Sequence, residues 1–206
     1  MIETLISIFG KAITALSWLF EKISRPRIAG RRAPIDIFEQ CGPGTSIERM
    51  KQVLGAPNKT SGNRFGYKFS DALVQVESED GISISALGVV LPRKKWRTNF
   101  RVYPHPLNLI LGKATLEDVL DEGAEIKWGS SSKEYILYMN TFYGFPGLYR
   151  GFTFGVIHAP FVSGADYRRD RHNGRLITNP KRIPLNWAAV SLSSEEAVLF
   201  DYWLFL

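Results

Sequence analysis

Apolar and polar positions over residues 2–24 repeat at the spacing of an α-helix. Apolar side chains recur three and four residues apart, and polar side chains fall on the opposite stripe. Pro26 ends the pattern, and Lys22 and Arg25 suit the negative C-terminal end of a helix. We therefore predict a helix with one broad apolar face, which is typical of contact with a membrane. The residues expected to make that contact are Leu5, Phe9, Ile13, Leu16, Trp18 and Phe20.

The use of this predicted helix has several interpretations. An acidic Glu3 in place of a basic start argues against a cleaved secretory signal, and Lys11 in the middle argues against a full transmembrane helix. A helix that lies on the membrane surface fits the composition better. A helix packed on the body of the protein, or on another copy of itself, stays open. If the helix spans, the arginines after it place the remaining chain in the cytoplasm. The predicted location is the cytoplasmic face of the inner membrane.

A second helix is predicted after the basic linker over residues 25–35. Thr45 and Glu48 have the spacing of a capping box, in which both side chains accept hydrogen bonds at the first turn. Gly55 and Pro57 end the helix. Its expected buried face consists of Ile47, Met50, Val53 and Leu54.

Alternating apolar positions predict an antiparallel meander after this helix. Residues 64–68 and 72–77 alternate, Glu79 to Gly81 suit a hairpin turn, and a return strand is expected from Ile82. The same order recurs about 70 residues later. There, Thr115 opens a predicted helix that ends at Gly123, and strands are expected at 126–128, 135–140 and 151–157. Residues 187–190 and 197–206 predict a C-terminal hairpin.

These elements predict an α+β fold of two tandem helix plus antiparallel-meander units, preceded by the N-terminal amphipathic or transmembrane helix. A single α+β domain with two helix–hairpin excursions is the alternative. The expected organisation is a membrane-associated helix at 1–24, a basic linker at 25–35, a first unit at 36–92, a basic and aromatic connector at 93–110, and a second unit with the C-terminal hairpin at 111–206.

The segment from Gly44 to Pro57, followed by the aromatic strand Phe65 to Phe69, resembles the start of outer-membrane assembly lipoproteins of the SmpA/OmlA type. It is also similar to the β-lactamase inhibitor proteins, which have two tandem helix–hairpin units. The resemblance covers about residues 42–90 well and 111–157 loosely. It implies a concave sheet that grips other proteins without catalysis. The chain lacks the lipoprotein cysteine of the first group and the disulfides of the second, so an exported location does not follow.

The charge distribution adds an anionic partner to this picture. The chain of 206 residues carries a net charge of +6, and its basic residues gather in three groups, near residues 22–32, 93–101 and 168–182. Such groups attract anionic surfaces, although solvated loops have the same composition. In 93–103, cations alternate with aromatic residues, which suits nucleic acid, lipid headgroups or a plain linker. The predicted anion- or headgroup-binding residues are Arg25, Arg27, Arg31, Arg32, Lys94, Lys95, Trp96 and Arg97.

Residue types that carry catalysis are sparse in this sequence. Cys41 is the single cysteine, and the three histidines lack the spacing of a metal site. Nucleophile-elbow, phosphate-loop and dinucleotide fingerprints are absent from the sequence. We therefore predict no enzyme, no metal and no cofactor. A concentration of aromatic residues over 142–154 suits either a core or a recognition surface.

Together these observations predict a non-enzymatic, membrane-associated module that binds another protein, in an immunity, inhibitor or assembly role. One alternative is a nucleic-acid-binding protein that uses the segment 93–103. Another is a membrane-perturbing effector whose N-terminal helix self-associates.

Overall fold

The computed structural model describes residues 31–92, 99–103, 109–120, 125–130, 134–170, 174–193 and 197–206. The chain divides into two units, 1–30 and 31–206, and the description that follows concerns the second. The predicted helix at 2–24 and its six membrane-contacting residues lie outside the described residues, as do Arg25 and Arg27. Within the described ranges, no helix is long and apolar enough to cross a membrane.

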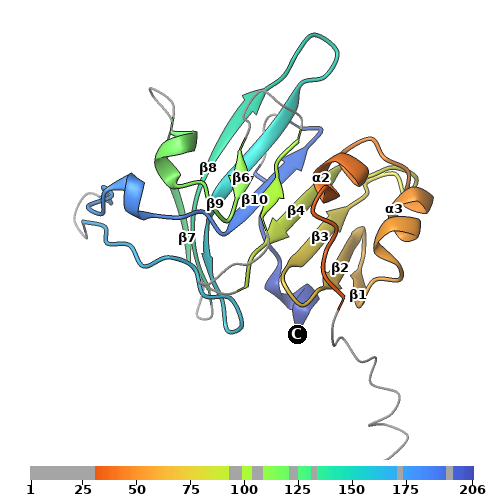
Figure 1. Cartoon of the computed structure of the whole chain (residues 1–206), viewed down its shortest axis with the longest axis horizontal. Helices are drawn as coiled ribbons and strands as arrows, with labels where there is room; N and C mark the ends of the chain where they lie inside the picture. The colour runs from red at the N-terminus through yellow and green to blue at the C-terminus, as the bar shows by residue number, and fades with distance from the viewer. Residues whose placement is uncertain are drawn as a thin grey trace, which may run out of the picture. The chain divides into compact units, whose positions relative to one another are not determined.

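An antiparallel sheet of eight strands forms the centre of the second unit (Figure 1). Two meanders, β1–β4 and β7–β9, meet at β10, which pairs with β4 on one side and with β9 on the other. The strand order is β1-β2-β3-β4-β10-β9-β8-β7. The strands are β1 (Lys59–Ser61), β2 (Arg64–Lys68), β3 (Leu73–Glu77), β4 (Ala86–Val90), β7 (Lys127–Ser130), β8 (Tyr135–Tyr143), β9 (Arg150–His158) and β10 (Trp187–Ser191), with β5 (Phe100–Arg101) and β6 (Ile110–Leu111) in a separate pair.

The predicted α+β fold with two tandem helix–meander units is wrong, because the described chain is mostly β. Its two α-helices, α2 (Ile37–Gln40) and α3 (Ile47–Leu54), both precede β1. The helix predicted from Thr115 is the single 3-10 turn η1 (Leu116–Val119). Leu120 leaves the helical conformation with φ −80° and ψ 107°, and its N–H bonds to the carbonyl oxygen of Glu117 at 3.3 Å. Among the described residues after η1, the central sheet contains β7, β8, β9 and β10 and no further α-helix occurs.

Helix α3 forms where the sequence predicts it, but its N-cap is one residue later than the predicted Thr45. Ser46 is the N-cap, since its hydroxyl oxygen accepts from the backbone N–H of Arg49 at 3.2 Å. Thr45 is used differently, because its carbonyl oxygen accepts from the N–H of Ile84 at 2.8 Å. This bond belongs to a short pairing between the residues before α3 and residues 82–84. The predicted return strand from Ile82 consequently starts at Ala86.

Both faces of the sheet are covered over its central strands. On the first face, helices α2 and α3, the β5–β6 pair and η1 contribute to one apolar core with Phe38, Met50 and Phe100. On the second face, the C-terminal segment 197–206 packs on the sheet with Val198, Phe200 and Leu204. The alternation of side chains along the central strands serves these two cores in turn.

The C-terminal segment is a cover for the second face rather than the predicted second strand of a hairpin. The buried side chain of Gln75 on β3 holds it: its Nε2 donates to the carbonyl oxygen of Leu199 at 2.9 Å, and its Oε1 accepts from the N–H of Asp201 at 2.8 Å. The segment ends in the 3-10 turn η3 (Tyr202–Phe205). Because the backbone bonds of residues 199 and 201 go to a side chain, the segment crosses the sheet without joining it.

Candidate functional site

The predicted anion-binding residues are largely beyond the described residues. Lys94, Lys95, Trp96 and Arg97 are not in the described ranges. Arg31 is described and is engaged within the fold: its guanidinium donates to the carbonyl oxygens of Val53 at 2.6 Å and Leu54 at 3.4 Å, and it lies 6.0 Å from the ring centroid of Phe69. Arg31 therefore serves as a cap on the C-terminal end of α3. Arg32 is exposed.

The aromatic concentration over 142–154 divides between core and surface. Phe152 and Phe154 on β9 are buried in the first core, where their rings stack with centroids 5.9 Å apart. The side chains around the turn that joins β8 and β9 are exposed instead. In Figure 1 this turn lies at the end of the hairpin far from the C-terminus. We call this surface the aromatic tip; it consists of Phe142, Phe145, Leu148 and Tyr149, which are 46%, 55%, 37% and 47% exposed.

Local geometry makes the aromatic tip an ordered surface. The N–H of Leu148 donates to the carbonyl oxygen of Phe145 at 2.8 Å, which closes a four-residue turn around Pro146 and Gly147. Gly147 has φ 85°, a conformation that the third position of a type II turn requires and that glycine adopts without strain. Next to the turn, the rings of Phe142 and Tyr149 stack across the hairpin, with their centroids 5.4 Å apart.

The hairpin that carries the aromatic tip has almost no charge. Between Tyr135 and His158, Arg150 is the single residue with a formal charge at neutral pH. Its guanidinium Nη1 donates to the carbonyl oxygen of Tyr149 at 2.7 Å, so the cation lies next to the tip. Exposed Phe and Tyr side chains beside an arginine have the composition that is enriched at the centres of protein interfaces.

A groove of about 630 Å³ lies between the outer strands β7–β8 and the C-terminal segment. This volume is in the usual range for ligand sites. We call it the β7–β8 groove; it is lined by Arg64, Gly129, Ser130, Glu134, Ile136, Tyr138, Leu199, Phe200, Asp201, Tyr202 and Trp203.

Carboxylates dominate the electrostatics of the β7–β8 groove. Burial and the negative charge of Asp201 raise the pKa of Glu134. Burial, then Glu134 and Asp201, raise the pKa of the Tyr202 hydroxyl. Arg64 adds one cation to the lining, with its Nε 3.0 Å from Glu77 Oε1 and its Nη1 3.6 Å from Asp201 Oδ2.

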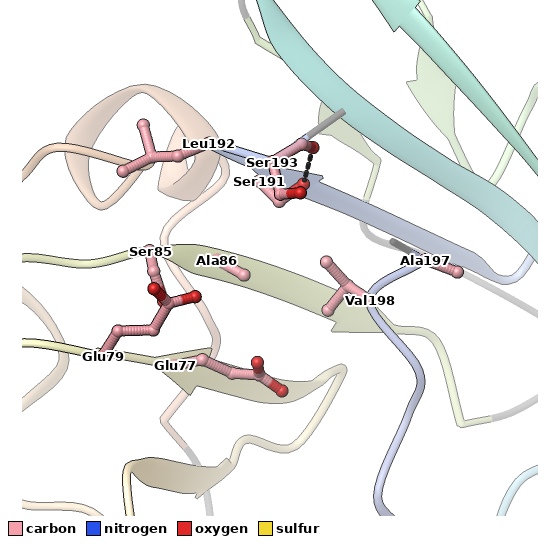
Figure 2. A pocket seen from close by; sticks show the side chains of 9 residues that line it. All are labelled: Glu77, Glu79, Ser85, Ala86, Ser191, Leu192, Ser193, Ala197 and Val198. Carbon is pink, nitrogen blue, oxygen red and sulfur yellow. Dashed lines mark hydrogen bonds between the residues drawn. The ribbon is translucent and has the colours of Figure 1, made fainter. Parts of the chain in front are cut away.

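A smaller pocket of about 330 Å³ lies on the same sheet between β3, β4, β10 and residues 197–198 (Figure 2). Glu77 and Glu79 line it together with the hydroxyls of Ser85 and Ser191. The dashed line in Figure 2 is the bond from Ser191 Oγ to the carbonyl oxygen of Ser193, at 2.8 Å. Because Glu77 contacts Arg64 at 3.0 Å, this pocket and the β7–β8 groove are linked through one ion pair.

Candidate nucleophiles and ligands from the sequence fall into structural roles where they are described. Cys41 is buried, and burial raises the pKa of its thiol to about 11, so the thiol stays protonated at neutral pH. Nε2 of His158 lies 2.8 Å from the carbonyl oxygen of Ala165. His105 and His172 are outside the described residues. No group of three or more metal-ligating side chains occurs among the residues that the structure describes.

Sequence reasoning missed the β7–β8 groove because its walls come from three distant parts of the chain, near residues 64, 129–138 and 199–203. The aromatic residues of the tip were noticed, but their spacing does not separate an exposed turn from a core. No protein-family model, curated protein or solved structure matches this chain.

Proposed function

We propose that this protein is a non-enzymatic binding module whose aromatic tip contacts another protein. The observation that carries the proposal is the ordered exposure of Phe142, Phe145, Leu148 and Tyr149 on one hairpin end. Contiguous exposed apolar side chains mark interaction sites, because contact with water is unfavourable for them and burial against a partner is favourable.

The proposed partner surface differs from the concave sheet that the family resemblance implies. Both faces of the central strands are occupied by the chain's own cores, so their side chains are not available to a partner. The aromatic tip, in contrast, projects from two paired strands of nine residues each. The hydrogen bond that closes the turn and the fixed φ of Pro146 limit the conformational entropy that binding would remove.

Site-specific photo-crosslinking in living cells tests this proposal. A benzophenone amino acid at position 145 is expected to give a discrete protein adduct. The same probe at position 177 is the matched control, because Ile177 is 59% exposed, close to the 55% of Phe145, but lies outside the tip. A second variant, Phe142→Ser with Tyr149→Ser, should abolish the adduct at 145 while the circular dichroism spectrum stays unchanged.

Three results would contradict the protein-binding proposal. Equal adducts at positions 145 and 177 would mean that the tip has no preference. An adduct with lipid alone would replace a protein by a membrane surface, and an adduct with nucleic acid would favour a nucleic-acid-binding protein. Membrane association through residues 1–24, nucleic-acid binding through 93–103 and the inner-membrane location stay predictions, since the residues that carry them are largely beyond the described ranges.

A further inference from the structure

We propose that the β7–β8 groove binds the side chain of an arginine or lysine in an extended segment of another polypeptide. This site is separate from the aromatic tip and goes beyond the function proposed for it. Three features of the described residues support the assignment: the charge of the groove, its aromatic walls and its place at the edge of the sheet.

The charge of the groove favours a cation. Glu134 and Asp201 both line the groove, and the negative charge of Asp201 contributes to the raised pKa of Glu134. Arg64 is shared between Asp201 and Glu77, at 3.6 Å and 3.0 Å. A cation in the groove would gain attraction from both carboxylates.

The walls of the groove suit the flat face of a guanidinium or the methylene stem of a lysine. Three aromatic residues, Tyr138, Tyr202 and Trp203, line the groove. A cation near the face of such rings is attracted by their quadrupole. The same chain already uses this contact elsewhere, since the guanidinium of Arg169 lies 5.3 Å from the ring centroid of Trp128.

The position of the groove selects a polypeptide over a free small cation. Strand β7 is the last strand in the sheet order, and its residues Gly129 and Ser130 line the groove. An extended segment that pairs with the outer edge of β7 would point every second side chain to the face that carries the groove. Main-chain hydrogen bonds would then supply affinity, and the charged side chain would supply specificity.

A titration of the full chain, followed by nuclear magnetic resonance, tests the proposal. The probe is a blocked five-residue peptide of threonine and valine with one central arginine. The backbone amide signals of Gly129 and Ser130 and the indole signal of Trp203 are expected to shift together. A peptide with norleucine in place of arginine should bind about tenfold more weakly, because it lacks the charge.

Matched variants separate the groove from general electrostatics. Glu134→Gln should weaken the arginine peptide about fivefold, whereas Glu79→Gln removes one charge from the neighbouring pocket and should leave affinity unchanged. Ser130→Lys places an ammonium group at the groove and should weaken binding about tenfold, which keeps the test decisive if Glu134→Gln disturbs folding. The double variant Phe145→Ser with Leu148→Ser should bind the peptide normally, so failure of the aromatic tip proposal does not affect this one.

Several outcomes would overturn the inference. Equal affinity for the arginine and norleucine peptides would make the groove a purely apolar site. Absence of shifts at Gly129, Ser130 and Trp203 would show that the groove takes no such peptide. Tighter binding of agmatine, a free guanidinium compound, than of the peptide would assign the site to a small organic cation.

Discussion

At the scale of single residues, Trp187 requires glycine as its neighbour on β9. The indole is 1% exposed and lies across the second face of the sheet. A Cβ at Gly155 would lie 3.1 Å from Trp187 Cε3 and 2.2 Å from the carbonyl oxygen of Leu137 on β8. The absence of a side chain at Gly155 thus allows both the indole and the neighbouring strand to approach.

Gly155→Ala is therefore expected to lower the free energy of unfolding by about 1–3 kcal/mol, the usual cost of overpacking. Gly129→Ala is the control on β7, because its Cβ would meet its nearest atom, Cβ of Ile136, at an ordinary 3.8 Å. Urea unfolding of both variants measures the difference. Equal stability of the two variants would show that β8 and β9 move apart without cost.

Asp80 makes the turn between β3 and β4 sensitive to acid. Its Oδ1 accepts from the backbone N–H groups of Ser83 and Ile82, each at 2.8 Å. These two bonds, of which the one from Ser83 has the larger effect, lower the pKa of Asp80 from 3.8 to about 2. A carboxyl with a lowered pKa in the folded state stabilises the fold above its ordinary pKa, and the effect is lost as the pH falls through the folded value.

We expect the free energy of unfolding to fall more steeply between pH 5 and pH 2 in the natural chain than in the variant Asp80→Asn. Asparagine keeps an acceptor oxygen but does not titrate, so its curve should lack this part of the slope. Glu79→Gln, one residue away, should retain it. Urea unfolding at a series of pH values provides the measurement, and an unchanged slope in Asp80→Asn would show that the carboxylate does not contribute.

At the scale of elements, α3 is capped by Arg31, which the sequence predicted as an anion- or headgroup-binding residue. Arg31 satisfies two carbonyl oxygens at the C-terminal end of α3, those of Val53 and Leu54. A cation at this end also interacts favourably with the helix dipole. Arg31→Ala should lower the free energy of unfolding by about 1 kcal/mol.

Arg32→Ala is the matched control for this prediction, because Arg32 is exposed and adjacent. It should change stability by less than about 0.5 kcal/mol. Thermal unfolding of the two variants gives the comparison. If both variants lose the same small amount, Arg31 is not a cap, and its earlier interpretation as a headgroup-binding residue regains support.

Local patterns predicted several elements because their causes are local. Alternation over 64–68 and the apolar spacing of Ile47, Met50 and Leu54 match β2 and the buried face of α3. The length of the element at Thr115 was not predictable in this way. Thr115 and Asp118 do form a capping box, yet Leu116 also bonds to the carbonyl oxygen of Ile183, and the turn ends at Val119.

The β7–β8 groove was not predictable from the sequence because contacts between distant parts of the chain form it. The C-terminal segment has a strand-like composition, but Gln75, more than 120 positions earlier, takes its backbone bonds. The β7–β8 groove exists because that segment crosses the sheet. Its lining residues were therefore predictable as apolar or charged positions, but not as one site.

At the scale of the whole described unit, the two faces of the sheet are closed by different parts of the chain. The first face is covered by segments before β1 and between β4 and β10, whereas the second depends largely on residues 197–206. Leu204 is 1% exposed and packs against the gap at Gly66, where a Cβ would lie 3.0 Å from Cβ of Leu204. The C-terminal segment is thus part of the fold.

This arrangement predicts that loss of one side chain near the C-terminus destabilises the entire second core. Leu204→Ala should lower the free energy of unfolding by about 2–5 kcal/mol, since it removes buried methyl groups and leaves a cavity. Leu206→Ala, two residues away and 56% exposed, should change it by less than about 0.5 kcal/mol. Urea unfolding of the two variants compares them directly. A loss below about 1 kcal/mol in Leu204→Ala would show that the segment is a removable strap, and the β7–β8 groove would then lack a fixed wall.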